Sequence, residues 1–124
     1  MSGLALQEIT ERSAALREAL GRRVVIADGA MGTMLQASDA TLEDFGGNEG
    51  GNEVLNVTRP DIVRGIHRAY FAAGADCVTT NTFGSNFGNL SEYGIPERIA
   101  ELSQAGAAAA RVVADEFTAA DGSV

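Results

Sequence analysis

The sequence predicts an α/β fold in which strands and helices alternate along the chain. Two short runs predict strands: 24–27 is continuously apolar, which is typical of a strand buried on both faces of a parallel sheet, and 77–80 is rich in β-branched residues. Each run leads through a loop to a helical pattern, and this order favours right-handed βαβ crossovers. Two parallel strands cannot cover their own edges, so we expect the chain to be part of a larger sheet.

An amphipathic helix is expected before the first strand. Apolar residues recur between Leu4 and Leu20 at helical spacing, with charged residues between them. Gly21 is expected to end this helix in a left-handed conformation, which assigns residues 1–21 to an N-terminal helix. The first strand then ends in the turn 28–33, where two glycines permit a tight bend and a close approach of the backbone.

A long loop and a second helix–strand unit follow. Residues 38–57 are rich in glycine and show no periodicity, so we expect a loop there. Thr58 is expected to cap a helix that has Pro60 in its first turn. Gly74 is expected to end that helix just before the second strand.

A third helix is expected from Pro96 to about Phe117. Apolar residues at helical spacing give this stretch one face that can be buried. The small and polar residues 118–124 are expected to form a flexible tail. Residues 22–117, between the N-terminal helix and this tail, therefore form the predicted domain.

Composition limits the possible classes of function. The chain has 124 residues, enough for one modest domain, and its 45% of hydrophobic residues can form a packed core. It has 9 basic and 17 acidic residues and a formal net charge of −8, which disfavours nucleic acid and anionic membranes as partners. No apolar run is long enough to span a bilayer. The single cysteine cannot form an intrachain disulfide, which favours a reducing, cytoplasmic compartment.

Two polar clusters follow the predicted strands. Ligands of parallel α/β folds bind beyond the carboxyl ends of the strands. Asp28 follows the first strand, and Asn81 and Thr82 follow the second. A carboxylate beside free backbone amides can hold both charged groups of an amino acid, which makes an amino acid a reasonable ligand. The ordinary chemistry of an Asp-Gly turn remains the alternative explanation.

Three other candidates are expected to have no chemical role. His67 lies off the apolar stripe of its helix, with no second histidine or cysteine at ligand spacing, so we expect a solvated side chain. Cys77 lies in a predicted buried strand, where a free thiol behaves as a small hydrophobe. The glycine-rich residues 46–51 lack the ending of a phosphate-binding loop and follow no strand.

Several stretches of the sequence, taken together, resemble the homocysteine S-methyltransferase family. They have the family's order and spacing, and they are Val25 to Met34, Asn52 to Val63, Ile66 to His67, and Ala73 to Asn86. The form Asn-Glu-x-Leu-Asn-x-Thr-Arg-Pro-Asp looks like the cobalamin-dependent members of the family. Members that use betaine or S-methylmethionine as the methyl donor are the alternative.

The resemblance implies the opening βα units of a partial (β/α)8 TIM barrel, with a homocysteine site at the carboxyl ends of the strands. It implies that Asp28 binds the homocysteine ammonium. The other residues that it implies at the site are Gly29, Ala30 and Met31, whose amides hold the carboxylate, and Asn81, Thr82 and Phe83, which line the mouth.

The resemblance also implies cofactors whose ligands this chain does not carry. Family members activate the homocysteine thiol with zinc bound by three cysteines. The cobalamin-dependent members take the methyl group from methylcobalamin, which methyltetrahydrofolate recharges on further domains. The zinc cysteines belong to later barrel strands, and Cys77 replaces none of them. We therefore expect no catalytic residue and no zinc or cobalamin ligand in this chain, and no activity of the chain alone.

Two other interpretations remain open. One is a small domain that binds an amino acid without catalysis, and the other is a structural piece completed by a second polypeptide. The uncovered edges of the parallel strands also predict that the isolated chain associates with itself or lacks fixed tertiary packing, as in a molten globule.

Overall fold

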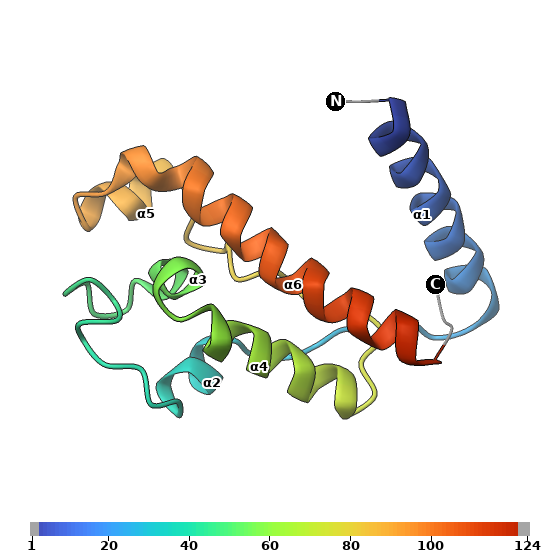
Figure 1. Ribbon diagram of the computed structural model, residues 1–124, viewed down its shortest axis with the longest axis horizontal. Coiled ribbons are helices and arrows are strands. Elements are labelled where there is room, and N and C mark those ends of the chain that lie inside the picture. Colours follow the sequence, from blue (N-terminus) through green and yellow to red (C-terminus); the bar gives the residue numbers. More distant parts are fainter. Residues whose placement is uncertain (1–2, 122–124) are drawn as a thin grey trace.

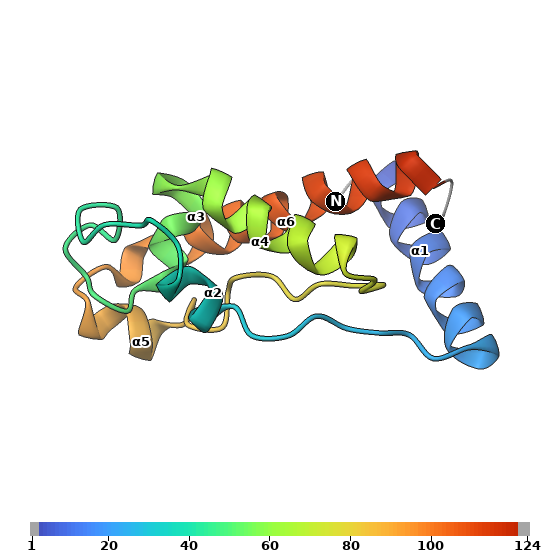
Figure 2. The same ribbon diagram turned by 90° about the horizontal axis from the view of Figure 1, so that it is seen from below.

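The computed structural model describes residues 3–121, which are mostly helical and contain no regular strand. The first helix, α1 (Gly3–Arg22), stands apart from the others, and an extended segment joins it to the rest (Figure 1). Helices α4 (Pro60–Ala72) and α6 (Ile99–Asp121) pack together and cover one side of two extended segments that run alongside each other (Figure 2).

The prediction of strands at 24–27 and 77–80 was wrong in extent, because a single bridge joins the two segments. This bridge pairs Ala27 with Cys77 in parallel, as the sequence predicted. The Asp28 amide donates to the Cys77 carbonyl at 3.0 Å. No third segment among residues 3–121 pairs with either edge, and a parallel ladder without neighbours does not extend.

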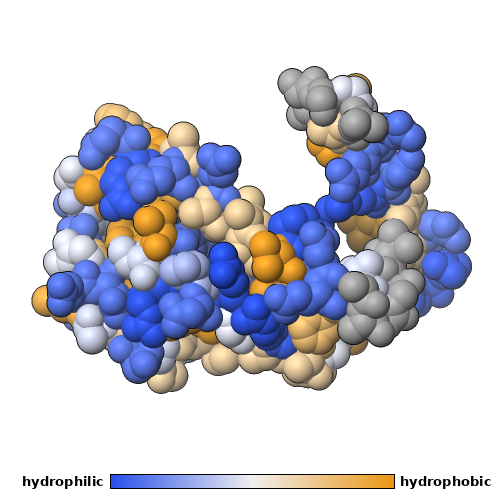
Figure 3. All heavy atoms as spheres, in the orientation of Figure 1, coloured by the Kyte–Doolittle hydropathy of each residue, from blue (hydrophilic) through white to orange (hydrophobic). Residues whose placement is uncertain are grey.

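The N-terminal helix was predicted correctly, although α1 runs through Gly21 instead of ending there. Its apolar side chains are about half exposed, and they include Leu6, Ile9, Leu16 and Leu20. The extended segment after α1 is open as well, with Val24 82% exposed. Figure 3 shows an open notch between much of α1 and the main body. The amphipathic face of α1 is therefore largely uncovered.

The core lies where α4 and α6 meet three short helices, α2 (Gly32–Gln36), η1 (Asn52–Val54) and α3 (Leu55–Thr58). Its fully buried apolar side chains are Leu35, Val54, Leu55, Val63, Leu90, Leu102 and Val113. The predicted loop at 38–57 was wrong in its last third, because η1 and α3 fold there and bury Val54 and Leu55. Before them the chain bends through Gly46, Gly47 and Gly50, which have positive φ.

Thr58 does not cap α4, contrary to the prediction. It is the last residue of α3, and its hydroxyl donates to the carbonyl of Asp44. Arg59 stands at the N-cap position of α4 without a side-chain cap. The difference arises because α3 precedes α4 directly, so Thr58 is already helical. Gly74, with φ of +110°, follows the end of α4, as the sequence predicted.

The last predicted helix forms and is longer than expected. A short helix, α5 (Phe87–Glu92), lies in the loop before it, and the 3-10 turn η2 (Pro96–Arg98) leads into α6. Helix α6 continues to Asp121, so residues 118–121 of the expected tail are helical, and 122–124 lie outside the described residues. None of the described helices has the length and hydropathy needed to cross a membrane.

Candidate functional site

The Asp28 carboxylate lies just beyond the Ala27–Cys77 bridge, at the carboxyl end of the first extended segment. One carboxylate oxygen accepts from the Thr79 amide and the other from the Thr79 hydroxyl, each at 3.0 Å. The side chain is half-buried, and it forms no ion pair with any residue that the structure describes. Its negative charge is therefore free to attract a cationic group of a ligand.

The turn after Asp28 presents three consecutive backbone amides. Within the described chain, the amides of Gly29, Ala30 and Met31 donate no hydrogen bond. The Tyr70 hydroxyl donates to the Ala30 carbonyl at 2.6 Å, which fastens the turn to α4. A Cβ at position 29 would lie 3.1 Å from that hydroxyl, so this close approach favours glycine. Consecutive free amides are suited to bind an anionic group.

Asn81 is buried in a hydrogen-bond network behind the turn. Its side-chain amide donates to the Asn52 carbonyl at 3.0 Å and to the Asn56 Oδ1 at 2.9 Å. Its backbone carbonyl accepts from the Asn56 Nδ2 at 2.8 Å. Asn52 also lies near the 28–31 turn. A Cβ built at Gly32, the residue that follows this turn, would have the Asn52 Nδ2 as its nearest heavy atom, at 3.8 Å. The two predicted polar clusters thus lie on the same side of the molecule.

Thr82 and Phe83 continue the same segment toward the surface. The hydroxyls of Thr82 and Thr80 share a hydrogen bond of 2.7 Å. Thr82 lies against α6, where a Cβ at Gly106 would come within 2.8 Å of the Thr82 methyl group. Phe83 is fully exposed. The three predicted residues therefore lie at increasing exposure from Asn81 to Phe83.

Sequence reasoning missed the buried polar residues of η1 and α3. Glu53 is 5% exposed and accepts from the Gly84 amide at 2.7 Å. Asn56 donates to the carbonyls of Asn81 and Leu102, at 2.8 and 3.1 Å. The available signal was their spacing of three, which places both on one face of a helix beside two apolar residues. We refer to Asn52, Glu53 and Asn56 as the polar clamp, since they hold the 81–84 segment.

The predictions for His67 and Cys77 were both wrong. His67, predicted to be solvated, is completely buried, because α4 turns the face with Val63 and Ile66 toward the core. Burial lowers the pKa of His67, and the nearby Asp28 carboxylate partly opposes this effect. Cys77, predicted to be buried, is exposed, and it borders an open hollow between α1 and α6.

A second group of charges, around Arg59, is structural. The Arg59 guanidinium forms ion pairs with Asp39, Asp44 and Asp61 at 3.0–3.1 Å. Hydrogen bonding to Arg59 lowers the pKa of Asp61. For Asp44, the hydrogen bond from the Thr41 amide is the first cause of a lowered pKa, and Arg59 adds to it. These contacts fasten the 39–44 loop to the start of α4.

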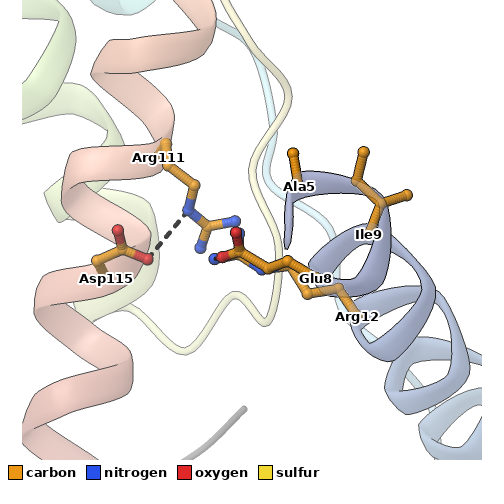
Figure 4. A pocket seen from close by; sticks show the side chains of 6 residues that line it. All are labelled: Ala5, Glu8, Ile9, Arg12, Arg111 and Asp115. Atoms are coloured by element: carbon orange, nitrogen blue, oxygen red, sulfur yellow. Dashed lines mark hydrogen bonds and ion pairs between the residues drawn. The ribbon is translucent and has the colours of Figure 1, made fainter. Parts of the chain in front are cut away.

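Two hollows lie away from the predicted site. The larger, of about 720 Å³, lies between α1, α6 and the 74–80 segment, and the smaller measures about 320 Å³. Figure 4 shows the smaller hollow, where Glu8 and Arg12 of α1 face Arg111 and Asp115 of α6. The charges pair within each helix, Arg12 with Glu8 and Arg111 with Asp115, so these ion pairs leave no charge here for a ligand.

The described residues do not fit the zinc site that the resemblance implies. Across residues 3–121, no three His, Cys, Asp or Glu side chains come together in a group that could hold a metal ion. Cys77 lies exposed on the bridge, and its thiol contacts the Ile26 carbonyl at 3.8 Å. No chemical step can therefore be assigned to zinc or cobalamin through these residues.

The family model described as homocysteine S-methyltransferase matches residues 25–124. The chain belongs to the homocysteine S-methyltransferase family. Over 106 residues it is 59% identical to the methionine synthase of Mycobacterium tuberculosis (strain ATCC 25618 / H37Rv) and 58% identical to that of Mycobacterium leprae (strain TN). These residues are 86% of this chain but 9% of each relative, so the chain spans a small part of their length.

Membership of the homocysteine S-methyltransferase family confirms the resemblance found in the sequence. The matched range includes the 28–31 turn, the polar clamp and the 81–84 segment. The N-terminal helix α1 lies before the matched range. The residues of the candidate site are thus all within the part of the chain that the family shares.

Proposed function

We propose that this chain supplies the first part of the homocysteine site of a methionine synthase, an enzyme that methylates the homocysteine thiol to give methionine. The family description and the names of the two relatives support this activity. The observation that carries the proposal is the Asp28 carboxylate, which lacks a cationic partner among the described residues and precedes three free amides.

Homocysteine carries an ammonium and a carboxylate at neutral pH, and the turn offers a complement to each. The ammonium pairs with Asp28 in a charge-assisted hydrogen bond. The substrate carboxylate accepts hydrogen bonds from the amides of Gly29, Ala30 and Met31. Thr79 holds the Asp28 carboxylate in place with two hydrogen bonds, so the site is partly organised before the ligand arrives.

The 81–84 segment forms the second wall of the proposed site. Asn81 is fixed by the polar clamp and orients this wall. Thr82 and Phe83 line the mouth, where the exposed Phe83 ring can cover the apolar part of a bound amino acid.

The fold proposed for the complete enzyme is a (β/α)8 barrel. A parallel bridge with helices on one side is compatible with the opening βα units of such a barrel. In this proposal later strands supply the zinc cysteines, and further domains carry cobalamin and methyltetrahydrofolate, in a cytoplasmic enzyme. The chain alone therefore binds substrate and transfers no methyl group.

Homocysteine binding to the purified chain tests this proposal. We expect calorimetry to detect binding that Asp28→Asn weakens about tenfold or more, because the variant removes the charge that attracts the ammonium. Asp39→Asn is the matched control, since it removes an exposed carboxylate on the 39–44 loop, and its affinity should equal that of the unmodified chain. Absence of binding, or equal binding by the Asp28→Asn variant, contradicts the proposal.

A further inference from the structure

His67 is completely buried, and neither ring nitrogen has a hydrogen-bond partner among the described residues. A buried polar group without a partner destabilises the folded state, because it loses its hydrogen bonds to water and gains none. Such a group in a native core calls for an explanation in terms of strain, function or a missing partner. Packing alone does not provide one, because an apolar side chain would fill the same space without this cost.

Helix α4 carries His67 on the face that holds the 28–31 turn. Tyr70 lies three residues further along, on the same face, and its hydroxyl donates to the Ala30 carbonyl at 2.6 Å. The same hydroxyl is the nearest atom to a Cβ built at Gly29. His67 is therefore placed behind the turn that begins with Asp28.

Asp28 is the charged group that acts on His67. Its carboxylate is the one charge in the described chain that raises the His67 pKa, against the larger effect of burial. Other titratable groups on α4 and on the elements packed against it make no such contribution, and they include Arg64, Arg68, Tyr70, Cys77, Arg111 and Glu116. Arg68 and Glu116 instead form an ion pair with each other at 2.9 Å.

We propose that His67 is a positioning residue of the amino-acid site, a buried neutral base that leaves the Asp28 carboxylate free for the ligand ammonium. A cation at His67 and an ammonium at Asp28 weaken each other, because two positive charges near the same carboxylate repel. By linkage, ligand binding weakens proton binding at His67, and a proton at His67 weakens ligand binding. This inference rests on the proposed function, since it assigns a further residue to the same site.

The coupling between Asp28 and His67 is measured first without ligand. His67 is the single histidine of the chain, so its imidazole signals in an NMR titration belong to one residue. A titration from about pH 8 to 4.5 covers the range in which a histidine with a lowered pKa takes up its proton. Asp28→Asn should lower the His67 pKa further, and the control Asp39→Asn should leave it unchanged. Equal pKa values in the unmodified chain and in Asp28→Asn overturn the inference.

The second measurement uses homocysteine as the probe. Saturating homocysteine should lower the His67 pKa in the unmodified chain, a readout that needs no variant. Homocysteine affinity, measured on either side of that pKa, should fall about fivefold or more on acidification. In His67→Gln, which is polar and neutral at every pH, the affinity should stay constant over the same range.

The outcomes separate this inference from the proposed function. Binding that keeps the same pH dependence in His67→Gln overturns the role of His67 and leaves the homocysteine site intact. A His67→Gln variant that binds more weakly by the same factor at every pH gives His67 a structural role, which also overturns the inference. Absence of binding at any pH contradicts the proposed function and removes the basis of the inference, whatever the ligand-free titrations give.

Discussion

Asn56 connects three parts of the molecule through one side chain. Its Nδ2 donates to the carbonyls of Asn81 and Leu102, and its Oδ1 accepts from the Asn81 side chain at 2.9 Å. Since Asn56 is only 3% exposed, water cannot easily replace these contacts. The side chain thereby fixes the position of Asn81, from which the proposed site wall extends.

We expect Asn56→Ala to lower the free energy of unfolding by about 2–4 kcal/mol, because it leaves buried carbonyl and amide groups without partners. Urea denaturation followed by circular dichroism measures the change. Asn48→Ala is the matched control, since the Asn48 side chain forms no hydrogen bond with the residues described, and it should cost less than about 0.5 kcal/mol. Equal losses in the two variants contradict this role of Asn56.

At the scale of elements, local signals predicted the three long helices α1, α4 and α6, whereas the short helices and the strand pairing depend on non-local contacts. Pro60 and Gly74 bracket α4 as expected, because proline suits a first helical turn and glycine accepts the positive φ after the last. The turn predicted over 28–33 is shorter than expected, because Gly32 and Thr33 already belong to α2. The burial of His67 was not predictable, because it depends on which face of α4 meets α6 and the turn.

The strand prediction was wrong for a related reason, since strand pairing also depends on contacts between distant parts of the chain. A short run of strand-forming residues becomes a regular strand only when neighbouring strands pair with it. Within the described residues, the pairing of these two segments is limited to the bridge between Ala27 and Cys77. The polar clamp was missed because Glu53 and Asn56 lie in a glycine-rich stretch that resembles a loop. Their burial follows from contacts with Gly84 and Leu102, which are distant in the sequence.

The close packing of α6 on the 81–82 segment gives a prediction for two helical glycines. A Cβ at Gly106 would lie 2.7 Å from the Asn56 Nδ2, whereas a Cβ at Gly65 meets nothing within 4 Å. Gly65→Ala should therefore stabilise the chain by about 1 kcal/mol through helix propensity. Gly106→Ala should destabilise it by about 1–3 kcal/mol, because overpacking outweighs the same propensity gain.

Chemical denaturation of the two alanine variants measures both effects under identical conditions. Each variant replaces a glycine inside an α-helix, so the gain in helix propensity is the same in both. The difference between their free energies of unfolding therefore measures the effect of the atoms that surround the new methyl group. If Gly106→Ala stabilises the chain as much as Gly65→Ala, α6 does not pack against the polar clamp as described.

The whole molecule leaves apolar surface uncovered along one side. Val24 is 82% exposed and Ile26 is 54% exposed on the segment that forms the bridge. The apolar side chains Leu6, Ile9, Leu16 and Leu20 of α1 are also about half exposed. Exposed apolar patches and unpaired strand edges both promote association with another chain. The structure therefore supports the expectation, made from the sequence, that the isolated chain associates with itself.

Analytical ultracentrifugation tests this association, and we expect the mean mass to rise with protein concentration. Ile26→Lys should shift the distribution toward the monomer, because a charge on an open edge disfavours strand pairing and removes apolar surface. Leu42→Lys is the matched control, since Leu42 is 58% exposed on a different loop, and it should leave the association unchanged. Both variants add the same charge, so a general effect of net charge would act on them equally. A monomeric unmodified chain at all concentrations, or equal shifts in both variants, would show that the open edge does not drive association.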